Sequence, residues 1–284
     1  MKTNTFFYTT LLALALAGNT KGQETKQKTF PATENIHALI VANINGSVNI
    51  TGSDQSDIRI TSRKTIDAAD EKKVSVHFEK INDTLLVFLE TPCNTLRTDK
   101  KWNTKKPWAI YCWTNSCEED IEYIIDFNID LPKNLTVFAS TINEGDLTIT
   151  DCVGPVATNN INGSITLTNV IDITHAKTIN GDLKMDFVQN PAIAGDFYTL
   201  NGDIEAFFLP GLAADISFKS FNGDFFTNVE DIKTMPTKVE KLDSKDGFTY
   251  KIGEALSMRI GQGSEVHLNF ETFNGDAILK IKSR

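Results

Sequence analysis

The chain has 284 residues, with 28 Lys and Arg against 37 Asp and Glu, so its formal net charge is −9. An acidic surface repels phosphate backbones, and we therefore expect no nucleic-acid partner. The charge is compatible with carbohydrate, protein or divalent cations as partners, although such a charge most often only keeps a protein in solution.

The first 22 residues have the layout of a cleavable secretory signal. Lys2 precedes an apolar run from Phe6 to Ala17, and the small residues Ala15 and Ala17 stand at its end. The run is too short to span a bilayer, which needs about 20 apolar residues. We therefore expect a signal peptide over residues 1–22, export to the periplasm, cell surface or medium, and no direct membrane insertion.

The mature chain, residues 23–284, is predicted to form one all-β domain. Apolar and polar residues alternate over residues 36–62 and 74–90, and again from Ile121 to Ile129, as they do in strands with one buried face. The charged residues 67–73 interrupt this pattern and fit either a helical turn or a loop.

Residues 92–119 break the strand pattern and are interpreted as an inserted loop. It contains all three tryptophans of the chain and several lysines. Its aromatic side chains are candidates for a platform that binds a sugar or a peptide, or they cover one end or face of the fold. These candidate ligand-binding residues are Trp102, Trp108, Tyr111 and Trp113.

Three of the four cysteines also belong to this loop. Export places them where disulfides persist, and the histidines needed for a common zinc site are missing nearby. We favour a disulfide between Cys93 and either Cys112 or Cys117, because it would close the base of the loop. Cys152 is interpreted as a small buried residue.

A tripeptide, Asn-Gly-Asp or Asn-Gly-Ser, recurs along the chain and once has an extra residue. From the second copy, consecutive glycines are separated by 18, 18, 21 and 21 residues, and repeats of about this length are typical of stacked architectures. We predict a structural turn at each glycine of the repeat: Gly46, Gly145, Gly163, Gly181, Gly202, Gly223 and Gly275.

Alignment of the copies on their glycine predicts which positions face inward. Apolar residues stand two residues before the glycine, two after it and, in most copies, four after it, so the inward face has period 2 and includes the glycine. A glycine there indicates either positive φ or close backbone approach. The residues two positions before the glycine are Ile44, Ile161, Ile179, Leu200, Phe221 and Phe273.

Two architectures fit this pattern. We favour a single-domain parallel β-solenoid with coils of about 18–21 residues, because the middle of each repeat lacks a second turn signal. The alternative is an antiparallel β-meander or sandwich, in which each Asn-Gly forms a two-residue hairpin turn.

The copies T-I-N-G-D-L, T-L-N-G-D-I, S-F-N-G-D-F and T-F-N-G-D-A, with the segment from Phe207 to Asp224, resemble the bacterial putative-adhesin family of exported repeat proteins. The resemblance extends over roughly Ile36 to Lys282. It implies a parallel β-solenoid in the bacterial cell envelope with an adhesive role.

The polar columns beside the glycines have two interpretations each. Stacked carboxylates at Asp182, Asp203 and Asp224 would lie about 5 Å apart and are weak calcium candidates, or each accepts hydrogen bonds from turn amides. The asparagines before each glycine form an amide ladder between coils or adopt a left-handed turn conformation.

No catalytic or nucleotide-binding motif is present in the sequence, and its four histidines are scattered. We therefore expect no cofactor and no catalytic residue. The favoured function is a non-enzymatic exported module that binds a protein or glycan. The alternative is a β-helical polysaccharide-cleaving enzyme, a glycoside hydrolase or lyase, that displays its acids on one face.

Overall fold

The computed structural model describes residues 21–31, 34–96, 111–113, 121–236, 239–244, 247–252, 255–262 and 265–283. Within these ranges the chain is all-β apart from short 3-10 turns such as Glu71–Lys73, which occupies the charged segment. The all-β prediction is confirmed. None of the helical segments described is long and apolar enough to cross a membrane. The predicted signal lies outside these ranges up to residue 20.

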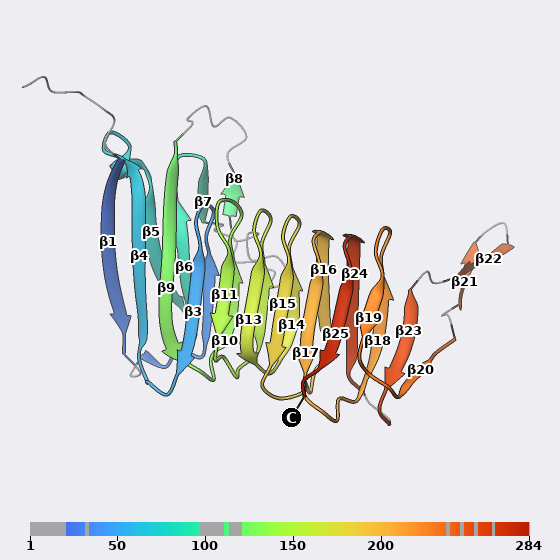
Figure 1. The fold of residues 1–284 in the computed structure, drawn as a ribbon. Helices are drawn as coiled ribbons and strands as arrows, with labels where there is room; N and C mark the ends of the chain where they lie inside the picture. The colour runs from blue at the N-terminus through green and yellow to red at the C-terminus, as the bar shows by residue number, and fades with distance from the viewer. Residues whose placement is uncertain are drawn as a thin grey trace, which may run out of the picture.

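Two mixed sheets, here called sheet A and sheet B, run along the length of the molecule (Figure 1). In spatial order, sheet A contains β1 (Lys21–Phe30), β4 (Ile58–Asp67), β9 (Tyr123–Pro132), β3 (Val48–Ser53), β11 (Leu147–Thr150), β13 (Ile165–Val170), β15 (Leu183–Phe187), β17 (Ile204–Phe208), β25 (Ala277–Ile281) and β19 (Phe225–Thr227).

Sheet B is ordered β20 (Ile232–Thr234), β23 (Leu256–Ile260), β18 (Ala214–Lys219), β24 (His267–Asn274), β16 (Gly195–Asn201), β14 (Ile173–Lys177), β12 (Val156–Asn159), β10 (Thr136–Ser140), β2 (Ala38–Ala42), β6 (Thr84–Glu90) and β5 (Ser75–Ile81). Two antiparallel pairs form separate two-stranded sheets: β7 (Asn94–Leu96) with β8 (Tyr111–Trp113), and β21 (Val239–Ser244) with β22 (Gly247–Ile252).

Through the repeats the chain alternates between the two sheets. Asn162-Gly163, for example, connects β12 of sheet B to β13 of sheet A, so the motif does not join two hydrogen-bonded neighbours. Neighbouring strands of this central part are parallel, and Ile165 pairs with Leu147 on one side and Leu183 on the other. Antiparallel pairs occur at the ends, such as β1 with β4 and β18 with β23, and make both sheets mixed.

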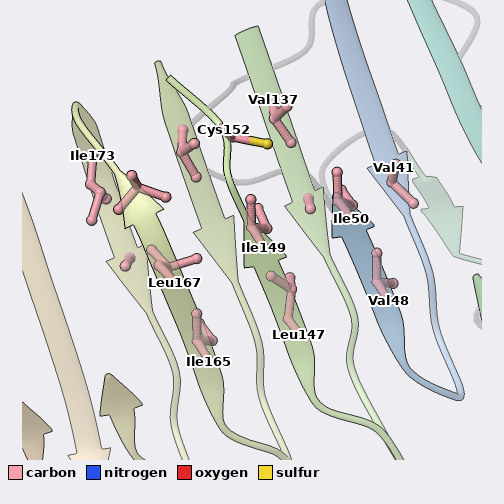
Figure 2. Packing of buried hydrophobic residues seen from close by; sticks show 14 of the residues in the cluster. Val41, Val48, Ile50, Val137, Leu147, Ile149, Cys152, Ile165, Leu167 and Ile173 are labelled. Atoms are coloured by element: carbon pink, nitrogen blue, oxygen red, sulfur yellow. The ribbon is translucent and has the colours of Figure 1, made fainter. Parts of the chain in front are cut away.

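The predicted apolar columns after each glycine form the core. The residues two and four positions after the glycine are buried in every copy except that of the edge strand β19, where Phe225 and Thr227 are half-buried. Figure 2 shows part of this packing, with Leu147, Ile149, Ile165 and Leu167 lying side by side on neighbouring strands. Each fully buried Leu or Ile side chain contributes about 1.5–3 kcal/mol relative to an exposed one.

Close backbone approach explains the glycine of the repeat. A Cβ atom on Gly181 would lie only 2.3 Å from the carbonyl oxygen of Gly163 in the neighbouring unit. No other residue fits such a contact. At Gly46 the backbone also has a φ of 114°, which L-residues rarely adopt.

The spatial order of the repeats differs from their order in the sequence. Strands β24 and β25, which carry the copy with Gly275, lie between the unit of Gly202 and the unit of Gly223. Stacking of Asp182, Asp203 and Asp224 as consecutive neighbours is therefore a wrong prediction. The copy ending in Asp276 separates the last two.

Candidate functional site

A row of buried polar side chains lies beneath the Asn-Gly corners. Thr178 is 1% exposed and donates its hydroxyl hydrogen to the carbonyl oxygen of Gly163 at 2.8 Å. Thr199 does the same toward Gly181, also at 2.8 Å. These threonines satisfy the carbonyls of the glycine column, and the only sequence signal for them is a Thr or Asn three residues before the glycine in most copies.

Because the threonine points inward, the apolar residue that follows it points outward. Ile179 is 37% exposed and Phe273 is 43% exposed, so the prediction that this position faces the core is wrong for these copies. Among the residues two positions before the glycine, only Ile44 is buried in the core. Side chains of successive residues on extended backbone point to opposite faces, and the hydrogen bond of the threonine decides which one is buried.

These outward residues form a continuous surface row, here called the apolar stripe. The backbone amides of Asn162, Asn180 and Asn201 donate to the carbonyls of the stripe residues in the neighbouring units, which places the copies directly beside one another. From the half-buried to the most exposed end, the apolar stripe consists of Ile142, Ile161, Ile179, Leu200, Phe273 and Phe221.

The exposed end of the stripe is an aromatic pair. The rings of Phe221 and Phe273 are stacked with centroids 4.9 Å apart and an interplanar angle of 4°. Phe221 is 74% exposed, so one face of the stack is open to solvent. Large exposed aromatic side chains in contact with each other are typical of recognition surfaces.

An asparagine ladder runs next to the apolar stripe. In each step the side-chain amide of one asparagine donates a hydrogen to the amide oxygen of the preceding copy, for example Asn180 to Asn162 at 2.9 Å. Of the two interpretations of these asparagines, these hydrogen bonds support the amide ladder. In spatial order the ladder contains Asn45, Asn143, Asn162, Asn180, Asn201, Asn274 and Asn222.

The aspartates that follow the repeat glycines accept hydrogen bonds from backbone N–H groups of the neighbouring unit. The Asp182 carboxylate accepts a hydrogen bond from the backbone N–H of Asp203 at 3.0 Å, and the Asp203 carboxylate accepts one from Asp276 at 2.8 Å. Asp224 lies at the end of this series and donates its N–H to Asp276. Among the described side chains, no group of three or more His, Cys, Asp and Glu residues could hold a metal ion.

The structure describes only part of the predicted aromatic platform. Trp102 and Trp108 lie outside the described residues, as does the side chain of Trp113. Tyr111 is 4% exposed, and its hydroxyl accepts a hydrogen bond from the Leu89 N–H. Tyr111 is therefore a core residue and does not belong to an exposed platform, because its hydroxyl completes the bonding of a buried backbone.

The cysteines differ in state. Cys93 is disulfide-bonded, and the choice between Cys112 and Cys117 as its partner stays a prediction. Cys152 is free and buried, and its sulfur points toward Val137 in the close view (Figure 2). Burial raises the pKa of its thiol to about 12, so the thiol is protonated and unreactive at neutral pH.

No family model and no curated protein matches the chain. Three solved structures are similar to it: a putative cell adhesion protein from Clostridium sporogenes, at 12% identity and a TM-score of 0.42, covering 92% of this chain and 100% of the other; a putative adhesin from Bacteroides fragilis, at 9% identity and 0.35, covering 93% and 99%; and a putative adhesin from Parabacteroides distasonis, at 10% identity and 0.27, covering 93% and 98%.

The names of these structures agree with the resemblance to the putative-adhesin family.

Proposed function

We propose that this protein is a non-enzymatic binding module, exported to the bacterial cell envelope, with an adhesive or scaffolding role toward a protein or glycan. We infer that its central part is a parallel β-solenoid whose coils of 18–21 residues present the apolar stripe along one edge. The observation that carries the proposal is the exposed Phe221–Phe273 stack beside the asparagine ladder.

The chemistry of this edge suits an extended polymer. An asparagine amide has two N–H hydrogens, and a ladder step uses one of them, which leaves the second for donation to a ligand hydroxyl or carbonyl. The adjacent ring faces offer apolar contact to the C–H face of a sugar or to an apolar side chain. Neighbouring units repeat at about 4.8 Å, so asparagine amides and apolar side chains recur along the edge, with the two rings at one end.

The test is a glycan-array and envelope-protein binding screen with the intact chain. A Phe221→Ala/Phe273→Ala variant removes the aromatic stack, and Phe226→Ala removes an exposed phenylalanine outside the apolar stripe as a control. We expect the double variant to lose the ligand and the control to keep it. Unchanged binding by the double variant would overturn the assignment to the stripe.

A second variant separates the stripe from the inserted loop. Replacement of Trp102, Trp108 and Trp113 by alanine tests the loop as the binding surface in the same screen. Loss of binding in this variant alone would move the site to the loop.

The non-enzymatic part of the proposal has its own test. The chain is incubated with bacterial and plant polysaccharides, and reducing ends and unsaturated products are measured over time. Release of either product, at a rate proportional to protein concentration, would favour the polysaccharide-cleaving alternative instead.

A further inference from the structure

The end of the molecule opposite the aromatic stack contains a cavity between the two sheets. Its wall comes from β1 and β4 at the edge of sheet A and from β5 at the edge of sheet B. The cavity has a volume of about 470 Å³, within the range of about 300–1,000 Å³ found for small-molecule sites.

The inward face of sheet A changes its chemistry at this end. In the central repeats its inward positions are apolar, but alternate residues of β1 place Glu24, Lys26 and Lys28 on the cavity wall, and β4 adds Ser62 and Lys64. Three cations and one acid thus line this wall, in a chain with a formal net charge of −9. The wall is a local positive region in an acidic protein.

Lys64 is fixed within this wall. It is only 8% exposed, and its ammonium donates hydrogen bonds to the carbonyl oxygens of Glu71 at 2.9 Å and Val74 at 3.2 Å. The Glu24 carboxylate lies 3.6 Å from the same ammonium and 3.0 Å from that of Lys26. The hydrogen bond from Lys26 lowers the pKa of Glu24, so this one carboxylate is ionised and shared between two lysines.

The ammonium of Lys28 lies over aromatic rings. Its Nζ is 4.6 Å from the ring centroid of Phe78 and 5.0 Å from that of Phe30. Val74, Val76 and Phe78 contribute apolar side chains to the opposite side of the cavity, which Ser75 and His77 also line. A cationic side and a largely apolar side therefore face each other across one space.

We propose that this cavity binds a small amphiphilic anion, with a carboxylate or phosphate group against Lys26 and Lys28 and an apolar body along Val76 and Phe78. The cations supply charge-assisted hydrogen bonds, and the apolar side removes hydrocarbon from water. This site is independent of the proposed function of the apolar stripe, whose aromatic pair lies at the other end of the stack.

A competing explanation is protection of a sheet edge. Lysines that point inward from an edge strand hinder pairing with another chain, and β1 is the edge of sheet A. If the lysines only protect the edge, no ligand binds saturably in the cavity, and substitution of the lysines causes only aggregation.

The test is isothermal titration of the whole exported chain, tagged at its C-terminus, with decanoate and with decyl phosphate below their micelle concentrations. Inorganic phosphate and acetate test whether the anionic group alone suffices, and decyltrimethylammonium tests the sign of the charge. We expect one saturable site for both amphiphilic anions, and at least roughly tenfold weaker binding of all three controls.

Variants locate the site. Lys26→Ala/Lys28→Ala is expected to weaken decanoate binding roughly tenfold or more, whereas Lys219→Ala/Lys233→Ala removes the same charge from distant strands and leaves binding unchanged. Equal loss in both variants, no saturable binding, or equal affinity for the cationic amphiphile would overturn the proposal. The comparison of anionic and cationic amphiphiles needs only the unaltered chain, so it decides even if the lysine variant aggregates.

Discussion

Asn274 donates a side-chain amide hydrogen to the amide oxygen of Asn201 at 2.8 Å, across 73 residues of sequence. Asn222, which precedes Asn274 in the chain, donates in turn to Asn274 at 2.9 Å. The copy around Asn274 is therefore the link between two units that are consecutive in the sequence and separated in space.

Substitution of the glycine in this link will test how tightly the units approach. In Gly275→Ala the new Cβ atom would lie 1.9 Å from the carbonyl oxygen of Gly202, and backbone cannot move away without breaking the ladder. We expect a loss of about 3 kcal/mol in the free energy of unfolding, measured by urea denaturation. Gly211→Ala is the control, since a Cβ there meets nothing within 4 Å and only the φ of 84° opposes it. A similar loss in both variants would show that close approach is not the reason for Gly275.

The buried threonine row will be tested by Thr199→Val, which keeps the shape and removes the hydroxyl. The carbonyl of Gly181 then loses a donor that lies 2.8 Å away. We expect a destabilisation of about 1 kcal/mol. Thr166→Val, on a half-buried outward position of β13, should stay within about 0.5 kcal/mol of the unaltered protein. A neutral Thr199→Val would mean that the hydroxyl has no net stabilising role.

Tyr111 will behave as a core residue. Its hydroxyl accepts from the Leu89 N–H and donates to the carbonyl of Ala42, so Tyr111→Phe leaves two buried backbone groups without this partner. We expect a loss of about 2 kcal/mol in thermal or urea unfolding. Tyr198→Phe, on a half-buried tyrosine, is the control. Loss of ligand binding without loss of stability in Tyr111→Phe would instead return Tyr111 to the aromatic platform.

The free thiol predicts a loss of stability at alkaline pH. Burial raises the pKa of Cys152 to about 12, whereas in the unfolded chain it is close to 9. As the pH rises, the unfolded state therefore releases this proton first. The contribution of the protonated thiol to the free energy of unfolding is complete below pH 9. It decreases between about pH 9 and about pH 12, by up to about 1.4 kcal/mol per pH unit.

Ionisation of Tyr111 and Tyr123 also lowers the free energy of unfolding in an overlapping pH range, because burial raises the pKa values of both tyrosines. The measurement is therefore the slope of unfolding free energy against pH, which should be smaller in Cys152→Ala than in the unaltered protein. In addition, a thiol reagent at pH 8 should modify Cys152 only after denaturation, and rapid reaction of the folded protein would contradict its burial.

The apolar stripe predicts a separation of binding from stability. Phe221 is 74% exposed, so Phe221→Ala should change the free energy of unfolding by less than about 0.5 kcal/mol while it weakens ligand binding. Phe270→Ala, in contrast, empties a fully buried position and should cost about 3–5 kcal/mol. If Phe221→Ala is as destabilising as Phe270→Ala, the stripe is a packing feature.

Period-2 patterns predicted the strands and the columns after each glycine because side chains on a regular strand must alternate. The same rule failed at the corner, since it treats Ile179 as equivalent to Leu183. Apolar character alone cannot show that Thr178 takes the inward position through a hydrogen bond to Gly163. The cationic cavity was equally hidden, because Lys26, Lys28 and Lys64 come together only through pairing of β1 with β4.

The order of the repeats could not be predicted for a different reason. The copies T-L-N-G-D-I, S-F-N-G-D-F and T-F-N-G-D-A present nearly the same apolar and polar positions, so any of them fits beside any other. Nothing local distinguishes a neighbour in sequence from a neighbour in space. The position of β24 and β25 depends on the long connection through residues 228–266, whose length allows them to return.

The place of β24 and β25 sets an order of assembly. A chain emerges from the ribosome N-terminus first, so residues 267–281 are made after both units that they separate. Until then, β17 and β19 each expose an edge that accepts a strand, and the two could pair with each other in the wrong register. Synthesis from the N-terminus therefore leaves the positions between these units empty until the last strands are made. The fold is completed when β24 and β25 of the same chain insert there.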